Sequence, residues 1–187
     1  MLLELFGALS ALIYLWLEIK QKSQMWIIGI VSGMVYVAVF STQSLYASAG
    51  IQAFFVIMSI YGWISWSRQR DKLSADPFFK RISAGSVIIY LLLTAALTLL
   101  LSTLLKLYSN DPYPIADSAI ASLSITATLL LSRRYIEQWY LWMIVNAASS
   151  LLYLYSSLYL TFVLYIIYFA ASVVGIREWR KYGEVLK

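Results

Sequence analysis

The sequence predicts an all-α integral membrane protein with seven transmembrane helices, arranged 3+1+3 as two parallel three-helix repeats. Hydrophobic residues make up 61% of the 187 residues and charged residues only 12%, with a mean hydropathy of +0.76. Soluble domains carry about 25% charged residues. Apolar segments recur at about the 20-residue length that a bilayer-spanning helix needs. The first three of these segments match the last three at a spacing of 113 residues.

Each apolar segment is expected to be a helix, because only helices satisfy the backbone in lipid at these lengths. The segments cover residues 2–18, 25–41, 44–66, 82–107, 116–132, 139–155 and 158–176. The polar strip 67–81 is the longest connection, and residues 108–115 form a proline-containing turn. We therefore predict a first repeat over 1–66, a connecting part with a linker helix over 67–115, and a second repeat with a tail over 116–187.

The repeat rests on identical residues at equivalent positions, such as Trp26 with Trp139 and Gly62 with Gly175. Each copy has an odd number of spans, so one linker helix is needed for both copies to point the same way. Parallel repeats of this kind are related by an axis along the membrane normal and form a substrate path at their interface, near the midplane.

The basic residues gather on alternate connections. Lys106 is the only one of the 14 lysines and arginines outside the first, third and fifth connections and the tail. Because cytoplasmic loops carry an excess of basic residues, the N-terminus is expected outside and the C-terminus in the cytoplasm. Topology thus accounts for the net charge of +5, and we expect no nucleic-acid partner.

The residues that are absent argue against an enzyme. The chain has no cysteine and no histidine, which removes thiol nucleophiles, the usual metal ligands and the usual general base. A Ser–Lys pair is the only nucleophile–base combination left, and Lys106 stands at the end of a span. We expect no cofactor and no metal.

The acidic residues bear on the energetics of transport. No carboxylate lies at mid-span, whereas ion-coupled transporters usually carry one there, so uncoupled facilitated diffusion is expected. Glu4 and Asp117 are equivalent in the repeat and lie near the outer ends of their spans. They either attract a cationic solute or stabilise helix N-termini.

Candidate substrate-binding residues lie on one face of segment 139–155. Trp139, Trp142 and Asn146 occupy positions i, i+3 and i+7. Asn146 either contacts the substrate or bonds to a neighbouring helix, and Trp139 also suits an interfacial position. The further substrate-binding candidates are Trp26, Tyr36, Gln52, Tyr165 and Tyr168.

Two glycines replace bulky residues in the first repeat. Gly29 is equivalent to Trp142, and Gly33 is equivalent to Asn146. The glycines either leave room for an asymmetric pocket or allow close helix packing. Trp66 and Trp179, beside the basic flanks, are expected to be interfacial anchors.

The candidate residues indicate the chemistry of the cargo. Aromatic walls with a few amides and hydroxyls suit a flat heteroaromatic ring, and ring faces attract cations. No span interior carries a lysine or arginine. The cargo is therefore expected to be a neutral or cationic aromatic solute and not a phosphate ester.

Several motifs resemble the Pnu family of vitamin transporters. In the first half these are WIIGIVS from Trp26, SLYA from Ser44, IQ at Ile51 and YGWISW from Tyr61. In the second half they are EQWYLWMIVN from Glu137, SLYLT from Ser157 and GIREWRK from Gly175. The resemblance implies a SWEET-like fold in a bacterial inner membrane and uptake by facilitated diffusion. It also implies a homotrimer and trapping of the cargo by a cytoplasmic kinase. It places the site and its gates on Trp139, Trp142, Asn146 and Gln52.

The resemblance leaves the vitamin open. The chain starts directly at its first repeat, which resembles the thiamine branch of the family and favours thiamine slightly over nicotinamide riboside. Both vitamins carry a cationic aromatic ring. The alternatives are riboflavin, another small solute carried by the same fold, and a structural membrane subunit that transports nothing.

Overall fold

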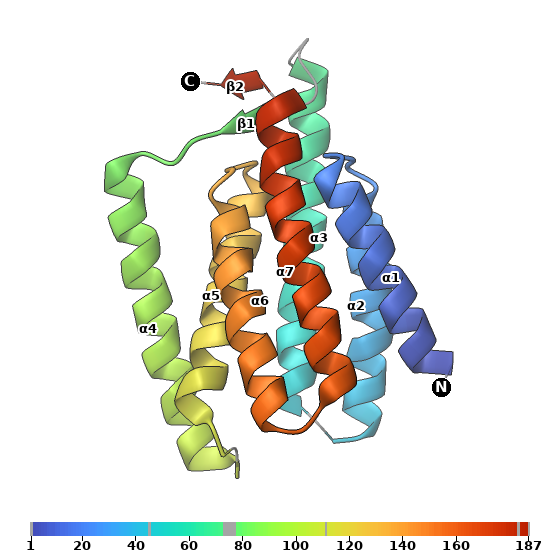
Figure 1. Ribbon diagram of the computed structural model, residues 1–187, viewed down its shortest axis with the longest axis vertical. Coiled ribbons are helices and arrows are strands. Elements are labelled where there is room, and N and C mark those ends of the chain that lie inside the picture. Colours follow the sequence, from blue (N-terminus) through green and yellow to red (C-terminus); the bar gives the residue numbers. More distant parts are fainter. Residues whose placement is uncertain (1, 45, 73–77, 111, 183, 187) are drawn as a thin grey trace. The chain divides into compact units, whose positions relative to one another are not determined.

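The structure is a computed structural model that describes residues 2–44, 46–72, 78–110, 112–182 and 184–186. Within them the chain forms seven α-helices and two short strands (Figure 1). In order these are α1 (Leu2–Ile19), α2 (Met25–Thr42), α3 (Tyr46–Lys72), β1 (Phe78–Lys80), α4 (Ala84–Tyr108), α5 (Pro114–Ser132), α6 (Gln138–Tyr155), α7 (Tyr159–Tyr182) and β2 (Glu184–Leu186). The predicted all-helical class is confirmed, because each predicted span is found as a helix.

Five helices are long and apolar enough to cross a membrane: α2, α3, α4, α5 and α7. In α1 the stretch Phe6–Ile19 forms a shorter apolar helix. The remaining helix, α6, is less apolar because polar residues such as Gln138, Asn146 and Ser149 lie along it, and all three are buried. The helix α6, which carries the predicted Trp139–Trp142–Asn146 stripe, therefore combines apolar and buried polar residues.

The connection expected over residues 67–81 is shorter than predicted. Helix α3 continues to Lys72, and β1 begins at Phe78, so that expectation was wrong at both ends of the strip. The helix continues because neither glycine nor proline interrupts the residues from Trp66 to Lys72. Strand β1 pairs with β2, the last described element of the chain.

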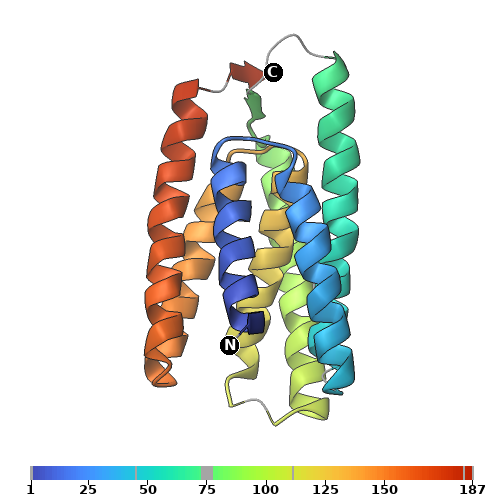
Figure 2. The same ribbon diagram turned by 90° about the vertical axis from the view of Figure 1, so that its right-hand side faces the viewer.

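The chain divides into two compact units. Unit 1 consists of Met1–Phe79, Ser132–Arg134 and Arg177–Leu186, and unit 2 of Lys80–Leu131, Tyr135–Ile176 and Lys187. Unit 1 therefore holds α1, α2 and α3 together with the end of α7 from Arg177 onward. Figure 2 shows α1 and α2 of this unit as neighbouring antiparallel helices joined by a short turn.

In unit 1 the small residues of α2 allow α3 to approach closely. A methyl group on Gly29 would lie 2.6 Å from the Ser59 hydroxyl oxygen, and one on Gly33 would lie 2.6 Å from Val56 Cγ2. Of the two interpretations open for these glycines, the structure supports close helix packing. The room that they leave is occupied by side chains of α3.

In unit 2 hydroxyl groups join α4 to α5. The Thr94 and Thr126 hydroxyls lie 2.7 Å apart. Along α5 the buried Ser118, Ser122 and Thr126 each donate to the carbonyl four residues earlier. These bonds satisfy hydroxyls that would otherwise be unpaired in lipid.

The repeat is visible in the helix ends. Helices α2 and α6 begin and end 113 residues apart, and so do the starts of α3 and α7. The four described non-glycine residues with positive φ are two equivalent pairs: Gln21 (51°) with Arg134 (60°), and Ser44 with Ser157, both at 59°. Left-handed backbone is unfavourable for such residues. Its recurrence at equivalent turns indicates that both copies share one turn geometry.

Candidate functional site

The predicted stripe on α6 has a buried, polar character. Trp139 and Asn146 are 0% and 5% exposed, and Trp139 packs against Gly175 of α7. The indole Nε1 of Trp142 is buried and has no hydrogen-bond partner among the described residues. A buried donor without a partner costs free energy, so this position is suited to a ligand that supplies an acceptor.

Asn146 is connected to α7 by hydrogen bonds. Its Nδ2 donates to Ser172 Oγ over 3.1 Å, and Ser172 Oγ donates to the Tyr168 carbonyl oxygen over 2.8 Å. The interhelical bond, one of the two roles considered for Asn146, is therefore present. It joins the amide to α7 within unit 2, and the amide oxygen can still act as an acceptor.

Tyr165 and Tyr168 lie together on α7, with ring centroids 5.6 Å apart. Tyr153 of α6 extends this pair, because its ring lies 5.1 Å from that of Tyr165. Sequence reasoning missed Tyr153. The repeat could have indicated it, since its equivalent, Phe40, is also aromatic and lies beside Tyr36 at 5.8 Å.

The other candidates belong to unit 1. The Tyr36 hydroxyl lies directly against Gly7 of α1. Gln52, on α3, is partly exposed, and its backbone carbonyl lies near Gly33. Trp26 is fully buried and packs edge-on against Trp66 at 5.7 Å. The structure thus places Gln52 beside α2, and it places Trp26 in a tryptophan cluster at the start of α2.

Trp66 and Trp179 are not interfacial anchors. Their exposed fractions are 0% and 1%, and their ring centroids are 6.4 Å apart. The indole Nε1 of Trp179 donates to the carbonyl oxygen of Glu18 over 3.1 Å. The expectation was wrong because both rings find protein partners within unit 1 and do not face the membrane surface.

A buried arginine completes this cluster in unit 1. Arg134 is 1% exposed, and its guanidinium lies between the rings of Trp66 (4.1 Å) and Phe78 (4.3 Å). Stacking of this kind is possible for arginine because its guanidinium is planar and weakly hydrated. Its burial could not be predicted from the sequence, since the neighbouring basic residues follow the pattern of cytoplasmic connections.

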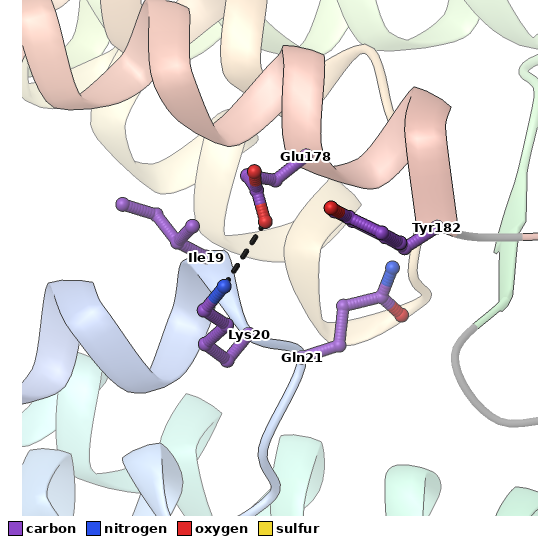
Figure 3. Close-up of a pocket in the computed structure, with 5 residues that line it drawn as sticks. All are labelled: Ile19, Lys20, Gln21, Glu178 and Tyr182. Carbon is purple, nitrogen blue, oxygen red and sulfur yellow. Dashed lines mark hydrogen bonds and ion pairs between the residues drawn. The ribbon is translucent and has the colours of Figure 1, made fainter.

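A shallow pocket lies next to this cluster, at the end of α1 (Figure 3). Lys20 Nζ and Glu178 Oε2 form an ion pair across it at 3.1 Å. Its lining residues are Ile19, Lys20, Gln21, Glu178 and Tyr182. The ion pair is half-exposed, so it neutralises the two charges without contributing much to stability.

Asp117 lies in the first turn of α5, which fits the helix-stabilising role, whereas the Glu4 side chain lies outside the described residues. In the described part of the chain no cluster of three or more acidic residues forms a metal site.

A predominantly apolar seven-helix protein in which α6 carries a buried polar stripe has the features of a small-solute membrane transporter. A sequence profile described as "Nicotinamide mononucleotide transporter" matches residues 1–181. The chain therefore belongs to this family of membrane vitamin transporters, and the resemblance predicted from its motifs is confirmed.

Individual relatives differ in their cargo. The chain is 27% identical to the nicotinamide riboside transporter PnuC of Escherichia coli (strain K12), over 95% of this chain and 84% of that protein. It is 28% identical to the riboflavin/roseoflavin transporter RibM of Streptomyces davaonensis, over 94% and 83%. A crystal structure of the vitamin B3 transporter PnuC superposes with a TM-score of 0.74 at 21% identity, covering 96% of this chain and 80% of that one. That likeness establishes a shared fold.

Proposed function

We propose that the protein carries a vitamin with a cationic aromatic ring across the bacterial inner membrane, with nicotinamide riboside as the first candidate. The observation that carries this proposal is the α6 stripe, in which the buried Trp142 Nε1 has no partner and Asn146 is fixed by Ser172. The similarity to the nicotinamide riboside transporter over 95% of the chain supports this cargo.

Thiamine has the same cationic aromatic character and was the first expectation from the sequence. Riboflavin is a further candidate because RibM, a riboflavin transporter, is similarly related. Calorimetric titration of the purified protein with all three vitamins decides among them. Nicotinamide riboside is expected to bind most tightly, and tighter binding of either other vitamin would replace it as the proposed cargo.

The proposed site is formed by the residues that the sequence singled out. Trp142 and Asn146 form its centre, with Tyr165 and Tyr168 as an aromatic wall. Tyr36 and Gln52, both in unit 1, are separate candidates for contact with the cargo. Trp139 is fully buried against Gly175 of α7 and supports the two helices that carry the site, and its equivalent Trp26 is fully buried against Gly62 in unit 1.

We propose facilitated diffusion as the mechanism, since no carboxylate lies at mid-span in the sequence. A cytoplasmic kinase that phosphorylates the cargo would prevent its return. Deleting such a kinase is expected to lower accumulation of the vitamin in cells. Liposomes that contain only the purified transporter should still take up the vitamin, because transport itself does not need the kinase.

The proposed orientation rests on the basic residues of the sequence, and the proposed assembly rests on the family resemblance. The basic connections and tail support a cytoplasmic C-terminus and an external N-terminus. Fusing a reporter that is active only in the cytoplasm to Lys187 tests this orientation. The homotrimer implied by the family resemblance is tested by light scattering of the detergent-solubilised protein.

A further inference from the structure

Gln138, the first residue of α6, is buried without any hydrogen bond from its side chain. It is 0% exposed, and neither Nε2 nor Oε1 has a partner among the described residues. An amide can make four hydrogen bonds, and nearly all buried side-chain polar groups make at least one. A fully buried amide that makes none therefore requires an explanation.

The repeat shows that packing does not require an amide here. The equivalent residue in the first copy is Met25, which begins α2 and is also 0% exposed. The same position at the same helix start therefore accepts an unbranched apolar side chain of similar length. Packing alone therefore does not account for the amide of Gln138.

The position of Gln138 on α6 indicates a role for the amide. Gln138, Trp142 and Asn146 are spaced four residues apart, so they follow one face of the helix. The two members nearest the start of the helix, Gln138 and Trp142, both have buried polar atoms without partners. Two adjacent residues of the stripe thus present buried polar atoms with which a ligand could form hydrogen bonds.

We propose that Gln138 is a specificity-determining residue that pairs with a donor–acceptor edge of the cargo. This inference rests on the proposed function. A glutamine amide presents one donor and one acceptor side by side, and so can form two parallel hydrogen bonds with such an edge. The carboxamide of nicotinamide riboside and the aminopyrimidine of thiamine both offer a donor next to an acceptor.

The test compares Gln138→Met, which installs the residue of the other repeat, with Gln24→Met. Gln24 is exposed and precedes α2 without any side-chain capping bond, so it controls for the same substitution outside the stripe. Affinities are measured by calorimetry for nicotinamide riboside and for the pyridinium riboside that lacks the carboxamide. The second pair of ligands is thiamine and its analogue without the ring amino group.

For the vitamin that the wild type binds, Gln138→Met is expected to weaken binding about tenfold, the size of one or two neutral hydrogen bonds. It should leave the affinity of the truncated analogue unchanged, and Gln24→Met should affect neither. Gln138→Glu, which loses the donor, is expected to weaken binding of the intact vitamin as well. Equal affinity of wild type and Gln138→Met for the intact vitamin would overturn the proposal.

Thermal unfolding without ligand separates this inference from the proposed function. If the wild type binds none of the vitamins, the proposed function fails, and the melting temperature of Gln138→Met then decides the role of the amide. A higher melting temperature than wild type supports an amide kept for a ligand at a cost in stability. A lower one shows that the amide is satisfied within the protein, which overturns the inference.

Discussion

Arg134 Nη1 donates to Gln21 Oε1 over 3.5 Å, and these two residues occupy equivalent positions in the two repeats. Both have left-handed backbone conformations, and both are buried in unit 1. Trp66 and Trp179, another equivalent pair, lie 6.4 Å apart in the same unit. Equivalent residues of the two copies thus meet in one cluster, organised around the buried guanidinium of Arg134.

Replacing Arg134 by lysine is expected to destabilise the protein by about 1–3 kcal/mol. An ammonium cannot stack between Trp66 and Phe78 as the planar guanidinium does. The melting temperature in detergent measures the effect. Arg133→Lys, at an exposed neighbour, serves as the control, and equal melting temperatures for the two variants would show that the stacking contributes nothing.

Ser157→Gly is expected to stabilise the protein by about 1 kcal/mol. Ser157 has a φ of 59°, a conformation that glycine adopts without the steric cost of a Cβ atom. Ser156→Gly is the matched control, because Ser156 has an ordinary φ of −79° and should gain nothing. Thermal unfolding compares the two variants, and equal shifts would show that left-handed strain is not the cause.

Alanine at Gly62 or Gly175 is expected to destabilise the protein by about 1–3 kcal/mol, the usual cost of overpacking. A methyl group on Gly62 would lie 2.5 Å from the Trp26 ring, and one on Gly175 would overlap the Trp139 ring. Gly50→Ala is the control, since nothing lies within 4 Å of its added methyl. Thermal unfolding that shows no difference from Gly50→Ala would contradict this packing.

The sequence predicted the helices well because the bilayer limits what a span can be. Their ends agree to within a few residues except at α3 and α7, where the helix continues into polar sequence. The buried Arg134 was not predictable, since its partners Trp66 and Phe78 come from distant segments of the chain. The basic residues near Arg134 follow the pattern of cytoplasmic connections, so membrane topology already explains why a basic residue occurs there.

Other features could be interpreted in two ways from the sequence. The spacing of Gly29 and Gly33 is the same whether they face a cavity or a neighbouring helix. Only the positions of Ser59 and Val56 show that they lie against a helix. Trp66 and Trp179 flank basic residues in the manner of interfacial anchors, yet they are buried because they contact each other.

Trp142→Ala and Gln52→Ala are each expected to weaken vitamin binding by about 1–3 kcal/mol, through loss of an aromatic or a polar contact. Trp16→Ala provides the control, because Trp16 is 60% exposed on α1. Titration calorimetry measures the affinities. Unchanged affinity in both site variants would place the binding site elsewhere in the protein.

The most direct test of a passive vitamin carrier is uptake of labelled nicotinamide riboside, and of thiamine in parallel, into liposomes that contain the purified protein. The internal concentration is expected to rise until it equals the external one, at the same final level with or without proton and sodium gradients. Accumulation above the external concentration, driven by either gradient, would contradict facilitated diffusion.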